Sequence, residues 1–84
     1  MVYRYKTSGT CSAYIDVEME GNVLKNAVFH GGCHGNLQGI SALTRGMTYE
    51  EIKERVAGIR CGYKSTSCPD QLVKAMEAAM AEEK

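Results

Sequence analysis

The chain has no tryptophan, one phenylalanine and one proline among its 84 residues. The absence of tryptophan and the single phenylalanine argue against a large apolar ligand pocket as the main feature. Ten basic and ten acidic residues cancel, and neither sign forms a block, which argues against a nucleic-acid or anionic-membrane surface. No apolar run approaches the ~20 residues of a membrane span, and the N-terminus has no apolar signal-peptide core. We therefore expect a cytosolic protein.

A chain of this length has a marginal core unless a metal, disulfides or a partner subunit stabilises it. Its four cysteines are Cys11, Cys33, Cys61 and Cys68. In a cytosolic protein, cysteines indicate metal or redox chemistry before they indicate structural disulfides. A functional prediction therefore depends on these four residues.

The sequence around the single proline contains two of the cysteines and predicts the start of a helix. Pro69 fits a first helical turn, and the carboxylate of Asp70 faces the positive end of the helix dipole. Ser67 or Thr66 is expected to cap this helix. Cys68 then lies at a helix N-terminus, where backbone N–H groups favour an anion, so we expect a thiolate there. A buried structural cysteine beside a cap is the alternative.

Alternating apolar and polar residues predict three strands, at Val2–Lys6, Ser12–Glu20 and Val23–His30. Gly21 and Asn22 predict a two-residue hairpin turn.

This turn sets a register in which the numbers of paired residues sum to 43. The expected cross-strand pairs are Ile15–Val28, Met19–Leu24, Tyr14–Phe29 and Glu18–Lys25. The same register puts Cys11 opposite Gly32, one residue from Cys33. Both cysteines are therefore expected at one end of the hairpin.

Helical spacing and capping residues predict three helices after the strands. The first starts at about residue 35, and its apolar stripe consists of Leu37, Ile40 and Leu43. Thr48 starts the second helix, with Glu51 as its capping-box partner. The third extends from Pro69 to about Glu82, and its apolar stripe consists of Leu72, Met76, Ala79 and Met80. This order predicts an α+β fold, in which a three-stranded antiparallel sheet is followed by three helices packed on one face.

Every cysteine falls in a predicted loop or at the end of a predicted element, rather than in an apolar stripe. The hairpin joins Cys11 to Cys33, and a short chain distance joins Cys61 to Cys68. If the two pairs meet, four thiolates could bind zinc or an iron–sulfur cluster. The sequence has no C-x-x-C motif, so a redox-active disulfide and unlinked thiols are alternatives.

The loop around Cys33 suggests a second kind of site. Its glycines and asparagine could cradle the phosphate of a nucleotide or flavin, because helix N-termini and nests of N–H groups bind anions. These candidate residues are Gly31, Gly32, Gly35 and Asn36. His34 is a candidate substitute metal ligand, whereas His30 is expected to end a strand.

Residues 66–70 read TSCPD, and the segments GGCHGN and CGYKSTSCPDQL resemble the two most specific segments of the TSCPD family. The chain resembles the small stand-alone members with four cysteines, which are related to a C-terminal domain of cobalamin-dependent ribonucleotide reductases. This resemblance implies a single domain over residues 1–84. It also implies an alternative function, a dithiol redox accessory to ribonucleoside-diphosphate reduction in which Cys61 and Cys68 cycle.

From Cys11 onward, the layout is also similar to iron–sulfur assembly scaffolds of the IscU and NifU type. By that likeness, the cysteines other than Cys61 match the three scaffold cysteines, but Ala13 replaces an aspartate and Ser67 replaces a histidine. Four thiolates form a closed site, which suits structural zinc or a retained cluster better than cluster delivery. The favoured hypothesis is thus a metal- or cluster-binding module, and no catalytic constellation is recognised. Expected partners are ribonucleotide reductase, iron–sulfur assembly proteins or a second copy.

Overall fold

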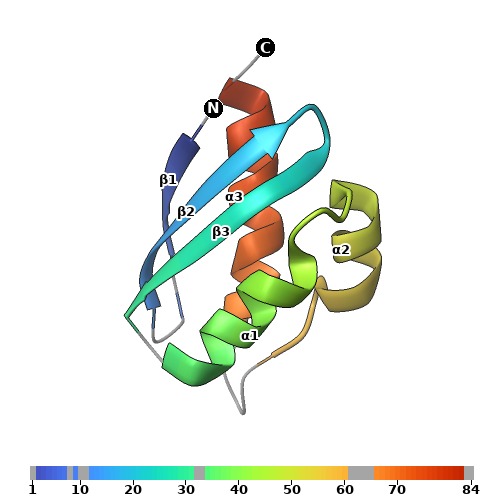
Figure 1. Ribbon diagram of the computed structural model, residues 1–84. Helices are drawn as coiled ribbons and strands as arrows, with labels where there is room; N and C mark the ends of the chain where they lie inside the picture. The colour runs from blue at the N-terminus through green and yellow to red at the C-terminus, as the bar shows by residue number, and fades with distance from the viewer. Residues whose placement is uncertain (1, 8, 10–11, 32–33, 61–65, 83–84) are drawn as a thin grey trace.

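The computed structural model describes residues 2–7, 9, 12–31, 34–60 and 66–82, with the backbone alone for Ser12 and His34. The elements in chain order are β1 (Val2–Lys6), β2 (Ser12–Glu20), β3 (Val23–Gly31), α1 (His34–Thr44), α2 (Tyr49–Val56) and α3 (Cys68–Glu82). The strands form one antiparallel sheet in the order β1-β2-β3 (Figure 1). The predicted α+β fold is confirmed. Within the described ranges, no helix combines the length and the apolarity needed to cross a membrane.

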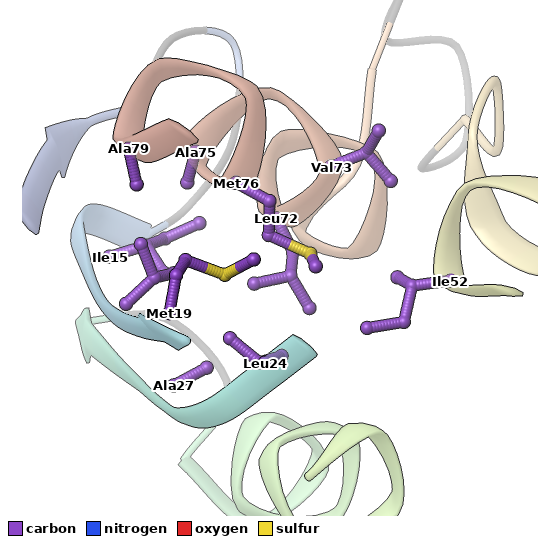
Figure 2. Packing of buried hydrophobic residues seen from close by; sticks show 11 residues of the cluster. Ile15, Met19, Leu24, Ala27, Ile52, Leu72, Val73, Ala75, Met76 and Ala79 are labelled. Carbon is purple, nitrogen blue, oxygen red and sulfur yellow. The ribbon is translucent and has the colours of Figure 1, made fainter. Parts of the chain in front are cut away.

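The core lies between one face of the sheet and α3 (Figure 2). Alternate residues of β2 point into it, as Ile15 and Val17 are fully buried. The predicted stripe of α3 packs against them, with Leu72 and Met76 fully buried and Ala79 2% exposed. Alternate residues of β2 and the helical stripe of α3 thus form one apolar layer, and the predicted apolar stripe of α3 is confirmed.

The β2–β3 register agrees with the prediction beside the turn and differs farther along the strands. Met19 pairs with Leu24 as predicted. The other three predicted pairs are wrong, because the observed pairs are Ile15–Phe29, Tyr14–His30 and Glu18–Asn26.

A β-bulge in β3 causes this difference. The register shifts between Glu18 and Met19, which leaves Lys25 as an extra residue on β3. An extra residue moves the later side chains of its strand to the opposite faces. Ala27 is therefore buried, whereas Val28, predicted opposite Ile15, is 44% exposed.

Helix α1 packs beside β3 with a narrower apolar stripe than predicted. Leu37 is buried, but Leu43 is 79% exposed, so the prediction that it faces the core is wrong. At 3.6 residues per turn, Leu43 lies about 120° around the helix from Leu37, and Thr44 lies only about 20° away. Thr44 accordingly takes the buried position, and its hydroxyl donates to the carbonyl of Ile40 at 2.8 Å.

The predicted capping box of α2 is confirmed. The hydroxyl of Thr48 accepts the backbone N–H of Glu51 at 3.2 Å, and the Glu51 carboxylate accepts the backbone N–H of Thr48 at 2.9 Å. Tyr49 then links α2 to α3, because its hydroxyl donates to the carboxylate of Glu77. This hydrogen bond raises the pKa of Tyr49.

The other face of the sheet carries an ion network around Asp16. Two guanidinium nitrogens of Arg4 donate to the two Asp16 carboxylate oxygens at 2.8 and 3.0 Å. The Nε2 atom of His30 lies 2.9 Å from Asp16 Oδ2. The hydrogen bond from Arg4, which outweighs the opposing effect of burial, and that from His30 lower the pKa of Asp16 to about 2.

We expect Asp16→Asn to lower the free energy of unfolding by about 1 kcal/mol at neutral pH, since ion pairs with exposed partners contribute little. A carboxylate with a lowered pKa stabilises the fold above its unfolded pKa of 3.8, and this contribution is lost as pH falls through about 2. Urea unfolding at several pH values should therefore show the difference between variant and wild type shrinking over that window. Glu18→Gln, on the same face of β2, is the control, and a pH-independent difference for Asp16→Asn would contradict the prediction.

Candidate functional site

Three of the four predicted metal ligands, Cys11, Cys33 and Cys61, lie outside the described residues. Cys68 is the first residue of α3 and is 9% exposed, so its predicted place at a helix N-terminus is confirmed. Among the described residues, no three histidine, cysteine or acidic side chains gather as a metal site requires. The four-cysteine site therefore stays a prediction. The described residues near each cysteine show which segments of the chain come together.

Ser67 caps α3 immediately before Cys68. Its hydroxyl accepts the backbone N–H of Asp70 at 3.2 Å, as an N-cap residue does for the third helical residue. Pro69 follows in the first turn, where the backbone N–H that proline lacks would have no partner within the helix. Of the two capping residues predicted, Ser67 is the one that fills this role.

Asp70 joins the chain on both sides of residues 61–65. Its carboxylate accepts the hydroxyl of Thr66 and, at 2.7 Å, the backbone N–H of Gly58. Burial alone would raise the pKa of Asp70, but the hydrogen bonds from Thr66 and Gly58 outweigh it and lower the pKa. Gln71 also holds Thr66, because its Nε2 atom donates to the Thr66 hydroxyl at 3.0 Å. One carboxylate thus fixes the chain before Cys61 and the chain before Cys68.

Gly9 approaches Thr66 from the β1–β2 connection. Its φ of +75° favours glycine, and a Cβ atom there would lie 3.0 Å from Thr66 Cγ2. This contact brings together the chain two residues before Cys11 and the chain two residues before Cys68.

Ser12 and Gly31 pair at the far end of the β2–β3 hairpin. Their numbers again sum to 43, because a second register shift, between Ser12 and Tyr14, compensates for the bulge. Ser12, which adjoins Cys11, therefore lies opposite Gly31, which precedes Cys33 by two positions. The predicted pairing of Cys11 with Gly32 falls outside the described residues.

The predicted phosphate site is described in part. Gly31 ends β3 with a φ of +88°, and Gly35 and Asn36 are exposed in the first turn of α1. A Cβ atom on Gly35 would meet nothing within 4 Å, so close packing does not explain this glycine. Gly32 lies outside the described residues, and phosphate binding stays a prediction.

We expect Gly9→Ala to lower the free energy of unfolding by about 1–2 kcal/mol, because alanine is strained at positive φ and its methyl group would press on Thr66. Gly46→Ala is the matched control, since Gly46 has a φ of +88° and open space around its Cβ position. Urea unfolding should show a larger loss for Gly9→Ala than for this control. Equal losses would mean that the approach to Thr66 is unimportant.

Sequence reasoning missed three residues that shape this region, Gly9, Gly58 and Gln71. Periodicity gave no signal for Gln71, because at 3.6 residues per turn it lies about 100° around α3 from Leu72 and about 140° from Met76, outside the predicted apolar stripe. The fold buries Gln71 nonetheless, and Thr66 supplies its hydrogen-bond partner. The contact of Gly9 had no local signal, since its partner is distant in the sequence.

A comparison with protein families matches residues 1–80 to the TSCPD domain. Neither curated proteins nor solved structures give a match to the chain. The family match includes all four cysteines and the residues around Thr66 and Asp70 described above.

Proposed function

The chain belongs to the TSCPD domain family, and we propose that it is a metal- or iron–sulfur-binding module with a four-cysteine site. The proposed ligands are Cys11, Cys33, Cys61 and Cys68. The supporting observation is the convergence on Thr66 and Asp70, because Gly9 contacts the first and Gly58 donates to the second. Chain segments that lead to three of the cysteines thus meet at the start of α3.

The donor set fits zinc or an iron–sulfur cluster, because four thiolates fill the coordination positions of either. A bound metal would cross-link these segments and add to the stability of a small domain. A closed site favours a structural or retained group, so the cluster delivery implied by the IscU and NifU likeness is the less favoured version. We propose a cytoplasmic protein whose partner is a ribonucleotide reductase, an iron–sulfur assembly protein or a second copy.

Metal analysis of protein purified without oxygen tests this proposal. We expect either a colourless protein with one equivalent of zinc, or a brown protein with iron, sulfide and visible absorption. Cys→Ser variants at each of the four positions should lose the metal and melt at lower temperature. Ser41→Ala, which removes one oxygen from the middle of α1, should retain the metal and the wild-type melting temperature.

A metal-free protein would contradict the metal proposal, and a thiol titration then tests the alternative. Two thiols gained on reduction would indicate the Cys61/Cys68 dithiol of a redox accessory. An unchanged thiol count would contradict that alternative as well.

A further inference from the structure

A cleft of about 350 Å³ lies between β3 and α1. Its described lining consists of residues 26–29 of β3, with Leu37, Gln38, Ser41 and Arg45 on the helix side. Such a volume is within the range of ligand-binding clefts. The cysteines contribute nothing to this described lining, so the cleft is a feature separate from the proposed metal site.

The lining shows that the cleft follows the edge of the sheet. Ala27 and Phe29 pair with core-facing residues of β2, whereas Asn26 and Val28 pair with residues of the opposite face. A cleft lined from both faces lies beside the strand itself, where the outward N–H and C=O groups of an edge strand lie. In the described sheet order, β3 is such an edge strand.

The cleft is long enough for a short extended peptide. Residues 26–29 span about 10 Å of strand, and residues 37–45 span about 12 Å of helical rise. About three residues of extended chain fit this length.

The adjoining part of the β3 edge is already paired with the chain's own residues. The N–H of Leu24 donates to the carbonyl of Met47 at 2.9 Å, and its carbonyl accepts the N–H of Gly46 at 2.8 Å. Val23 and Thr48 form an antiparallel bridge beside them. This edge therefore accepts an antiparallel partner, and residues 46–48 block any guest strand from continuing past Asn26.

The blocked end of the cleft is cationic and the other end is apolar. Arg45 Nη2 donates to Asn26 Oδ1 at 3.3 Å, and a guanidinium has further N–H donors for a carboxylate. Arg45 is the single charged residue among the described lining residues. Leu37 and Phe29 lie toward the other end. A chain that stops at Arg45 would present its terminal carboxylate to this cation.

We propose that the cleft binds the C-terminal tail of a partner protein as a short strand antiparallel to β3. A tail that enters beside Phe29 and ends beside Asn26 runs antiparallel to β3, with its carboxylate at Arg45 and an apolar side chain on Leu37. Main-chain hydrogen bonds provide affinity in this mode of recognition, and the two ends of the cleft provide specificity.

The test uses two pools of fluorescein-labelled hexapeptides whose last three positions carry Val, Ile, Leu or Phe. One pool ends in a carboxylate and the other in an amide. Fluorescence anisotropy should show that the carboxylate pool binds the full chain at least about tenfold more tightly. Arg45→Gln and Ser41→Glu should each weaken this binding at least about tenfold, and Arg55→Gln on α2 should leave it unchanged. Amide NMR signals of residues 26–29 should shift on binding.

Equal affinity for the two pools would overturn the proposal, as would the absence of binding at millimolar protein. Unchanged binding by both Arg45→Gln and Ser41→Glu would also overturn it, and circular dichroism confirms that these variants are folded. Sedimentation that shows a dimer dissociated by Arg45→Gln would assign the cleft to a second copy instead of a tail.

Discussion

Leu72→Ala should lower the free energy of unfolding by about 4 kcal/mol, because truncation of a buried leucine costs its transfer free energy and leaves a cavity. Leu72 is fully buried, with 0% of its surface accessible to solvent. In Figure 2 it points from α3 toward the sheet, beside Met76 and Leu24. The cavity would lie between rigid elements, which limits how far neighbours can relax into it.

This loss would be a large part of the total stability, since domains of this size unfold at a cost of about 5–10 kcal/mol. The melting temperature should fall by roughly 16 °C or more. Calorimetry and urea unfolding measure the two quantities independently. A loss below about 1 kcal/mol would mean that the core does not close around this residue as described.

Leu43→Ala is the matched control, because it makes the same chemical change at a site that is 79% exposed. We expect a change within about 0.5 kcal/mol. The comparison also tests the structure against the sequence pattern, because the pattern predicts both leucines on buried helix faces whereas the structure buries only Leu72. If the two variants cost the same, the orientation of α1 would be wrong.

Local patterns predicted the elements well, because each depends on neighbouring residues. The strand β2 has the predicted bounds, and the Thr48–Glu51 capping box and the Ser67 cap form as expected. Turn, cap and alternation signals act over a few residues, and a single sequence contains them in full. The α+β order followed from these signals alone.

The bulge at Lys25 and the edge cleft could not be predicted in the same way. A bulge changes the phase of a strand without leaving a clear mark in its composition, so the turn alone predicts Val28 opposite Ile15. The cleft depends on the distance between α1 and β3, and the periodicity of a sequence contains no information on that distance. Periodicity assigns residues to faces, whereas Arg45 and Asn26 meet at an edge.

The candidate site was predicted only at its helix end. Cys68 lies where the Pro69 signal put it, but the approach of Gly9 to Thr66 joins positions that are far apart in the chain. Such a contact depends on the packing of the whole fold. The TSCPD motif contains this information indirectly, because its threonine and aspartate are the residues on which the described segments converge.

Asp70→Ala should lower the free energy of unfolding by about 3 kcal/mol. The substitution leaves the Thr66 hydroxyl and the Gly58 N–H without their acceptor, and hydrogen bonds to a charged group are worth about 1.5–3 kcal/mol each. It also removes a negative charge from the first turn of α3, which costs about 0.5 kcal/mol more. The partly exposed position of Asp70 keeps the total below the sum of these amounts. Urea unfolding measures the loss.

Two variants show whether the loss comes from the link that Asp70 makes. Asp70→Asn keeps an oxygen acceptor but no charge, so it should lose about half as much, whereas Ser67→Ala removes only the cap and should cost about 1 kcal/mol. Hydrogen exchange at the Gly58 amide should accelerate in Asp70→Ala and stay slow in Ser67→Ala, because Gly58 bonds to the carboxylate and not to the serine. If Asp70→Ala cost no more than Ser67→Ala, the aspartate of the motif would be a helix-capping residue alone. Its loss would then leave the chain that leads to Cys61 in place, and the convergence that supports the four-cysteine proposal would need another cause.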